Sequence, residues 1–381
     1  VHGATSGRAR SPVDLPGCNR QWVFPIHPQT SMVLVSATKL ALDKKTSLDV
    51  AGPFFDLQSF EDGAGDVLAL PFEEVEEASE AASLPNLPST FAGEVFRRMR
   101  LAPDLADRRA DWDFRPVSEF HATNDKAVFA SADDTGTVPV LRGRAFDIWQ
   151  PETGDVYAWG NEATIVNALT KKRAHQVRLP SSAFYRLPSE WADDPATLPL
   201  RSPRVAFRDV TNATNTRTVL AALLPGGVAL TNKAPYLFRR EGAPKTEAYL
   251  LGILSSVPLD WYARRFVELA LNFHILNSLP IPEYDAAGPL DQRIVEIAGR
   301  LAAVDKRYAE WAAEVGVPVG SVKKEAEKNE LIYELDALVS LKYGLPREHV
   351  EHIFETFHRG WDASERLERV LQYYDQWESK A

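Results

Sequence analysis

The sequence predicts an α+β protein in which an irregular, strand-rich region is followed by a C-terminal helical subdomain. Between residues 111 and 245, short apolar pieces alternate with turn residues, as they do in a mixed sheet. After residue 283, apolar residues recur at helical spacing in segments that Gly and Pro separate. Nothing repeats at a fixed period, so a solenoid is not expected.

The first part of the chain predicts few regular elements. Residues 22–39 (WVFPIHPQTSMVLVSATK) read as one strand or two short ones. Residues 72–83 are acidic and favour a helix, which the Pro-rich SLPNLPS ends. Residues 91–109 predict a helix followed by a charged turn.

The strand-rich region contains six strand-like pieces: AVF at 127, VPVL at 138, DVYAW at 155, HQVRL at 175, RVAF at 204 and GVAL at 227. One connection, RVAFRDVTNATNTRTVLAALLP, begins as a buried strand and ends in an apolar run. We interpret that run, residues 217–224, as a helix with Thr216 as its cap.

Helical periodicity begins near residue 246. Residues 246–268 carry apolar residues at helical spacing, with Pro258 at a kink or break, and residues 271–282 form an extended exit. Four amphipathic helices are expected after it, over 290–312, 321–343, 346–357 and 361–378. The chain thus divides into a connector with an acidic segment (1–110), a strand-rich domain (111–282) and a helical subdomain (283–381).

Bulk composition narrows the class of protein. The chain has 381 residues, 45% of them hydrophobic, which is enough for large cores. No apolar run approaches the roughly 20 residues of a membrane span, and the first residues do not form a secretory signal. The single cysteine, Cys18, fits a reducing compartment, so we expect a cytoplasmic protein with no membrane partner. Because the chain begins abruptly at Val1, we expect a piece of a longer polypeptide.

Charge is segregated along the sequence. The net charge is −10, but residues 46–96 contain eleven acidic side chains and no Lys or Arg, so the rest of the chain sums to +1. Residues 201–270 hold ten basic side chains against five acidic ones. A basic face attracts phosphate even where the average charge is negative. Ordinary solvent-exposed surfaces with no DNA partner would give the same numbers of acidic and basic residues.

No catalytic, cofactor-binding or metal-binding residue is predicted. The sequence has no glycine-rich phosphate loop, and its eight histidines lack metal-ligand spacing. NKAPYLF at 232–238 is similar to the Asn-Pro-Pro-Tyr motif of adenine methyltransferases. Two residues separate its Asn from its Pro, however, and no cofactor loop precedes it.

Polar and basic side chains at strand ends are the candidates for contact with DNA. Arg and Lys neutralise phosphates and fork onto guanine, whereas Asn forks onto adenine. Asn and Thr are also common turn and cap residues, which is the structural explanation for part of the set. The predicted DNA-binding residues are Arg142, Arg144, Lys171, Lys172, Arg173, Arg204, Arg208, Asn212, Asn215 and Arg217.

Seven stretches, taken in order, resemble the large adenine-specific DNA methyltransferases that carry methylation and target recognition on one chain. Such enzymes occur in type IIG restriction–modification and in related phage-defence systems. The resemblance covers most of residues 22–357. The stretches are WVFPIHPQTSMVLV, HATNDKAVF, VPVLRGRAFDIWQP, FYRLPSEW, RVAFRDVTNATNTRTVLAALLP, LGILSSVPLDWYARRFVELALNFHILNSLPIP and ELDALVSLKYGL.

The resemblance implies that residues 111–282 form a target-recognition domain that docks in the major groove of double-stranded DNA. The helical tail would clamp the duplex or connect domains. The parent enzyme would transfer a methyl group from S-adenosylmethionine to adenine N6 after flipping the base. This chain lacks the cofactor and catalytic motifs, so methylation would require the methyltransferase domain of the same polypeptide.

The acidic segment supports an alternative from another class. Residues 46–96 would then form a protein-interaction module that mimics DNA or docks a basic partner.

Overall fold

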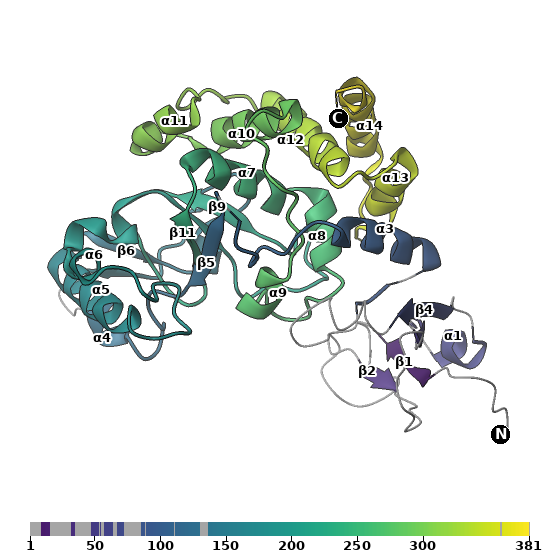
Figure 1. Cartoon of the computed structure of the whole chain (residues 1–381), viewed down its shortest axis with the longest axis horizontal. Coiled ribbons are helices and arrows are strands. Elements are labelled where there is room, and N and C mark those ends of the chain that lie inside the picture. The colour runs from purple at the N-terminus through teal and green to yellow at the C-terminus, as the bar shows by residue number, and fades with distance from the viewer. Residues whose placement is uncertain are drawn as a thin grey trace.

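The structure is a computed structural model, and it describes residues 9–15, 32–34, 47–52, 54, 57–63, 67–71, 85–87, 89–109, 111–129, 136–358 and 360–380. Helices and sheets both contribute, which confirms the α+β class predicted from the sequence (Figure 1). The acidic helix predicted over 72–83 lies outside the described residues. So does most of the strand predicted over 22–39, of which β2 (Met32–Leu34) is described.

A four-stranded antiparallel sheet occupies the centre of the molecule, in the order β5-β11-β8-β9. Its strands are β5 (Asp113–Val117), β11 (Tyr236–Glu241), β8 (Arg204–Phe207) and β9 (Ala221–Leu224).

The strand β9 corrects the helix predicted over residues 217–224. Alternate residues of β9 belong to two different cores: Ala221 and Leu223 pack with the C-terminal helices, and Ala222 and Leu224 pack on the other face. A strand buried on both faces is apolar at every position, so the run carries no strand alternation. Thr216 consequently lies in the connecting loop and caps no helix.

A side lobe, formed by α4, α5, α6, β6 and β7, lies against the outer face of the central sheet (Figure 1). In its small sheet β6 pairs with β10 in parallel and with β7 antiparallel. The bounds are β6 (Val138–Leu141), β7 (Ala158–Gly160), β10 (Ala229–Leu230), α4 (Lys126–Phe129), α5 (Glu162–Gln176), α6 (Ser189–Asp193) and the 3-10 turns η1 (Gly143–Ala145), η2 (Pro195–Thr197) and η3 (Pro199–Arg201).

Two predicted strands of this lobe are helical. AVF at 127 lies in α4, and the HQ of HQVRL ends α5. Helix α5 begins at the N-cap Asn161, whose side chain accepts a hydrogen bond from the Thr164 N–H, and it buries Ile165 and Leu169 four residues apart. The helical spacing of apolar residues before HQVRL therefore decides the structure of its first two residues, and the short strand-like alternation within HQVRL does not.

The remaining helices follow the predicted order, with two corrections. The extended exit predicted over 271–282 contains a short helix, Phe273–Asn277, because the Asn272 side chain accepts from the Ile275 N–H and caps it, and the helix predicted over 290–312 is divided into Pro289–Ala302 and Ala309–Val315. Residues 91–109 form α3 and a turn, and the break expected near Pro258 falls between α7 and α8. The bounds are α3 (Thr90–Arg100), α7 (Pro244–Leu254), α8 (Val257–Ala263), α9 (Phe273–Asn277), α10 (Pro289–Ala302), η4 (Lys306–Tyr308), α11 (Ala309–Val315), α12 (Glu325–Lys342), α13 (Arg347–Thr356) and α14 (Ser364–Glu378). A smaller sheet of order β2-β1-β3-β4 lies near the N-terminus, with strands β1 (Ala9–Leu15), β3 (Ser47–Ala51) and β4 (Val67–Pro71) and the helix α1 (Leu57–Glu61).

One large apolar core joins the central sheet to the C-terminal helices. It contains Phe114 of β5, Leu251 of α7, Ile294 of α10 and Leu338 of α12, all buried. Residues on both sides of position 282 therefore share one core, and the division of the chain into three parts stays a prediction. Within the described part of the chain, no helix is both long and apolar enough to cross a bilayer.

Candidate nucleic-acid interface

Two of the predicted DNA-binding arginines are enclosed by protein. Arg173 is 2% exposed and donates to the carbonyl oxygens of Ala192 (2.9 Å) and Asp194 (2.6 Å). Arg204 is 3% exposed and pairs with Glu119 at 2.9 Å. Both guanidinium groups are therefore committed to protein partners.

The Arg204–Glu119 pair joins β8 to the side lobe. Burial raises the pKa of Glu119, and Arg204 together with the Leu230 N–H offsets part of that effect. The same carboxylate accepts from the Leu230 N–H at 2.7 Å, and Arg204 also donates to the Val228 carbonyl at 2.8 Å. A buried charge is tolerated only with such partners, so this pair has a structural role.

The Arg-Gly-Arg motif at 142–144 is also explained largely by packing. Arg208 donates to the carbonyl oxygens of Gly143 (2.6 Å) and Phe146 (2.7 Å) and so holds the turn η1 against β8. A Cβ on Gly143 would lie 2.6 Å from Arg208 Cγ and 2.8 Å from the Lys233 carbonyl oxygen. Glycine is therefore required here by close approach of the backbone.

The two arginines that flank Gly143 differ in exposure. Arg142 is partly exposed, lies 3.6 Å from Asp155 and stacks over the Tyr157 ring at 5.4 Å. Arg144 is exposed to solvent. Arg144 is thus the member of this motif that a ligand meets first.

An aspartate at the centre of a buried network holds the connection 208–218. Asp260 of α8 is fully buried, accepts from Arg217 Nε at 2.5 Å and from Arg264 Nε at 3.3 Å, and accepts from the Thr218 N–H at about 3.0 Å. The Arg264 guanidinium also donates to the carbonyl oxygens of Ala213, Asn215 and Thr216, at 2.7–2.9 Å. The polar side chains of residues 208–218 therefore serve mainly to anchor this loop on α8.

The two predicted asparagines take part in the same loop structure. The Asn212 side chain accepts from the Thr214 N–H at 2.9 Å, as in an Asx turn, and Asn215 donates to Thr211 Oγ1 at 3.3 Å. Both are half-buried, whereas Thr214 and Thr216 are exposed. The exposed hydroxyls are the groups that this loop presents to a ligand.

The predicted lysines lie on α5, not in a loop before a strand. Lys172 pairs with Asp125 at 2.6 Å and also donates to the Glu119 carbonyl at 3.0 Å. Its neighbour Lys171 is exposed. The structure therefore leaves Arg144 and Lys171 as the exposed cations of the predicted set, and it does not bring the set together on one face.

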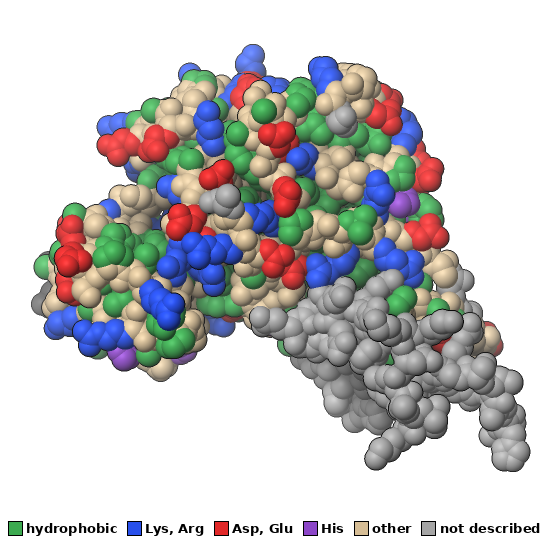
Figure 2. All heavy atoms as spheres, in the orientation of Figure 1, with side chains coloured by type: hydrophobic (Ala, Val, Ile, Leu, Met, Phe, Trp, Pro, Cys, Tyr) green, Lys and Arg blue, Asp and Glu red, His purple; other side chains and the backbone are tan. Residues whose placement is uncertain are grey.

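A basic patch that the sequence analysis missed covers the edge strand β5 and its neighbour β11. We define the β5–β11 patch as Arg108, Arg115, Arg186 and Arg240. Figure 2 shows Lys and Arg side chains gathered over these strands. Arg115 and Arg240 share the buried carboxylate of Asp113, at 2.5 Å and 3.7 Å. The Arg-Arg pair in YLFRRE, directly after an apolar strand, was the available sequence signal.

Hydrogen bonds hold two guanidinium groups of the patch, those of Arg115 and Arg240, whereas Arg108 and Arg186 extend into solvent. Arg240 donates to the Tyr185 carbonyl at 2.9 Å, next to Arg186 in sequence. Arg186 is exposed and has φ +63°, a left-handed conformation that costs energy for a residue with a side chain. Arg108 lies 3.7 Å from Glu241 at the end of β11, with 68% of its side chain exposed. The result is a group of four arginines, two of which, Arg115 and Arg240, are held by one buried anion, Asp113.

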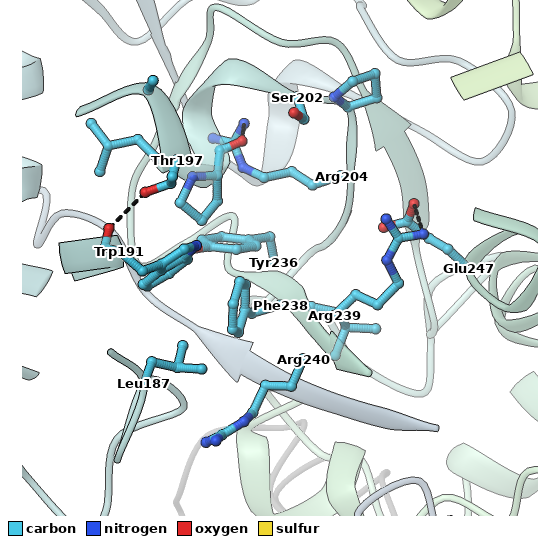
Figure 3. A pocket seen from close by; sticks show the side chains of 15 residues that line it. Leu187, Trp191, Thr197, Ser202, Arg204, Tyr236, Phe238, Arg239, Arg240 and Glu247 are labelled. Atoms are coloured by element: carbon cyan, nitrogen blue, oxygen red, sulfur yellow. Dashed lines mark hydrogen bonds and ion pairs between the residues drawn. The ribbon is translucent and has the colours of Figure 1, made fainter. Parts of the chain in front are cut away.

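A pocket of about 320 Å³ opens beside this patch. Figure 3 shows Trp191, Tyr236 and Phe238 forming an aromatic wall, with Arg239 directed at Glu247 on the other side. Arg239 Nη1 lies 3.9 Å from Glu247 Oε2 and makes no hydrogen bond to the described residues. Burial raises the pKa of Glu247, and Arg239 and the Trp311 N–H offset part of that rise.

The arrangement is suited to binding an anionic or planar ligand. Guanidinium groups recognise phosphate, and aromatic walls stack on bases or sugars. Among the residues that the structure describes, no three His, Cys, Asp or Glu side chains lie together as a metal site. The fold and the site together define an α+β protein with an arginine-rich surface at a sheet edge.

Comparisons with known proteins add a distant structural likeness. No protein-family model matches the sequence, and no curated protein matches it. Among solved structures, the chain is similar to the type IIL restriction-modification enzyme MmeI in complex with DNA, at 12% sequence identity and a TM-score of 0.39. The match covers 98% of this chain and 46% of the MmeI chain, so this chain spans about half the length of that enzyme.

Proposed function

We propose that this chain is the DNA target-recognition part of a site-specific adenine-N6 DNA methyltransferase from a restriction–modification or phage-defence system. The structural observation that supports it best is the β5–β11 patch, where exposed guanidinium groups are fixed at a sheet edge. The seven ordered sequence stretches support the choice of family.

Phosphate contact falls to the exposed cations. Arg108, Arg115 and Arg186 would meet the backbone of the duplex, and Arg144 and Lys171 would extend the contact over the side lobe. Phosphate contacts fix the register of a protein on DNA but carry no sequence information. Because Arg115 is already held by Asp113, little side-chain entropy is lost when it binds.

Base reading would fall to the loop that Asp260 anchors. Its exposed Thr216 hydroxyl would donate to or accept from a base edge, and the Thr214 hydroxyl, which already donates to Asn212 Oδ1 at 2.6 Å, would accept. A rigid support keeps such groups in register with the groove. Arg208 and Arg217 would support this loop from within and would not touch a base.

Methylation would need parts outside this chain. S-adenosylmethionine and the flipped adenine would bind the methyltransferase domain of the longer polypeptide, and this chain would select the site. The chain alone is therefore expected to bind double-stranded DNA without modifying it.

A salt-dependent binding assay tests the proposal. Fluorescently labelled duplex is titrated with the full chain at two salt concentrations, using wild type and the double variant Arg115→Gln, Arg186→Gln. Each lost phosphate contact lowers the slope of log K against log salt by about 0.9, so the double variant is expected to lose about 2. The matched control is Arg347→Gln on α13, a similarly exposed arginine away from the patch.

Two results distinguish the site from the function. Duplex binding with the wild-type slope in the double variant would mean that the patch is not the interface. Failure of the longer polypeptide to methylate adenine in any duplex would contradict the family, whatever the binding result.

A further inference from the structure

Helix α5 lies in the side lobe (Figure 1) and exposes one face along its length. Five polar or basic residues mark this face, three or four positions apart as the helical period requires: Thr164, Asn167, Lys171, His175 and, just past the end of the helix, Arg178. The other side carries Ile165 and Leu169, which pack into the core of the lobe. From Thr164 to His175 the exposed face extends about 16 Å, at roughly 1.5 Å per residue.

The polar groups on this face are not used by the fold. None of the five side chains makes a hydrogen bond or an ion pair with the part of the chain that the structure describes. Elsewhere on α5 the basic groups have partners: Lys172 pairs with Asp125, and Arg173 donates to two backbone carbonyl oxygens. The exposed face is therefore a row of available donors and acceptors on a regular helix.

The charge of this face is suited to a polyanion. The one acidic residue of α5, Glu162, lies two and a half turns before Lys171, on the opposite side of the helix, and pairs with Arg201 at 2.5 Å. The end of α5 also adjoins the β5–β11 patch, because the Arg186 N–H donates to the Val177 carbonyl at 3.0 Å. The helix face and the patch therefore meet, and a long anionic ligand of the patch reaches α5.

Double-stranded DNA is the polyanion whose shape fits such a helix. Its major groove is about 12 Å wide and admits one α-helix. Helices that read DNA in this way place their N-terminal residues on base edges. Asn167 lies in the N-terminal half of α5, and an asparagine amide forms two hydrogen bonds with adenine, at N6 and N7. Lys171 lies one turn further on, towards the patch, where a phosphate contact is expected.

We propose that α5 is a second reading element for double-stranded DNA, with its exposed face in the major groove, Asn167 on an adenine and Lys171 on a phosphate. The inference rests on the DNA-recognition function proposed above and adds a helix to the loop that Asp260 anchors. The β5–β11 patch then follows the DNA backbone at the C-terminal end of the helix. Part of the sequence preference comes from a neutral side chain, which a salt titration does not detect.

Selection of bound sequences from a random duplex library tests the role of α5 on the full chain. Asn167→Ala is expected to weaken the preference for one A·T pair by about five- to 150-fold, while the preferences at other positions and the salt slope stay as in wild type. Lys171→Gln does the reverse: the preferred sequence stays, and the magnitude of the salt slope falls by about 0.9. Alanine favours a helix more than asparagine does, so Asn167→Ala is expected to fold. The matched control, Gln376→Ala, removes an exposed amide from α14 and leaves both quantities unchanged.

A modified base tests whether the contact is direct. A duplex with 7-deazaadenine at the affected position lacks N7, so wild type should bind it more weakly, whereas Asn167→Ala should lose nothing further. Equal losses in both proteins, or a wild-type sequence preference in Asn167→Ala, overturn the role of α5 and leave the DNA-recognition function standing. If wild type binds no duplex, the DNA-recognition function itself is wrong, and the role of α5 is wrong with it.

Discussion

The substitution Asp260→Asn probes the network that holds the connection 208–218. Asp260 is fully buried and neutralises Arg217 and Arg264 while accepting from the Thr218 N–H. Asparagine has nearly the same shape, but it removes the negative charge and places an amide donor among donors. The change therefore isolates the electrostatic contribution of one carboxylate.

The loss of folding free energy in Asp260→Asn depends on which hydrogen bonds Arg217 and Arg264 keep. Breaking a buried ion pair from one side costs about 3–5 kcal/mol, because the other charge is left buried without compensation. Arg217 keeps the Ser255 carbonyl at 2.8 Å and Arg264 keeps that of Asn215 at 2.8 Å, so part of the solvation survives. We therefore expect the free energy of unfolding to fall by about 3 kcal/mol, the lower end of that range.

Urea unfolding monitored by circular dichroism measures the change, and hydrogen exchange of the loop amides shows where it acts. The control is Glu152→Gln, which removes an exposed pair with Arg307 at 2.6 Å and should cost less than about 1 kcal/mol. If Asp260→Asn is as stable as the control, and the amides near Thr218 keep their protection, the network does not hold the loop.

Three further substitutions address single contacts. Gly143→Ala places a Cβ 2.8 Å from a backbone oxygen and should lower the unfolding midpoint in urea; an unchanged midpoint would mean that the turn η1 moves freely. Glu119→Gln leaves Arg204 buried without a counter-charge and should cost about 3–5 kcal/mol by the same measurement, and a loss below 1 kcal/mol would contradict a structural role. Because burial raises the pKa of Glu247 in the folded state, that group lowers stability as the pH rises above its usual value of 4.5. The stability of Glu247→Gln relative to wild type should therefore increase as the pH rises above 4.5, by the same urea measurement, and a decrease would contradict the raised pKa of Glu247.

The elements that the sequence predicted correctly are those whose signals are local. VPVL and RVAF are strands because β-branched and aromatic residues lie between turn residues. The C-terminal helices were predicted because an amphipathic period of 3.6 extends over many residues, as in α10 and α14. Each of these signals is readable without knowledge of what packs against it.

The errors concern segments whose structure depends on distant partners. Residues 221–224 are a strand because two different cores cover their two faces, and the sequence of the run alone does not reveal the second core. AVF at 127 is a single helical turn beside α5, too short for any period to appear. Tertiary packing decided both cases.

The sequence could not separate arginines that are available to DNA from arginines that are buried in the fold, for a related reason. Arginine has five donors, which suit phosphate and clustered carbonyl groups equally well. The partner that claims Arg204 is Glu119, 85 positions earlier in the chain, and Arg217 is claimed from α8, 43 positions later. The sequence pattern located clusters of polar and basic residues, but it did not indicate which guanidinium groups are exposed to solvent.

Exposure therefore changes what the charge count of the sequence means for DNA. The basic excess over residues 201–270 includes Arg204, which pairs with buried Glu119, and Arg217 and Arg264, which share the one buried carboxylate of Asp260. In the proposed complex, the attraction for a polyanion would come instead from five exposed or partly exposed side chains, those of Arg108, Arg115, Arg144, Lys171 and Arg186. Five such contacts would give a slope of log K against log salt near −4.5, since each phosphate contributes about 0.9. A slope near −9, as ten accessible cations would give, is incompatible with the buried network, and measuring it on the wild-type chain separates the two descriptions directly.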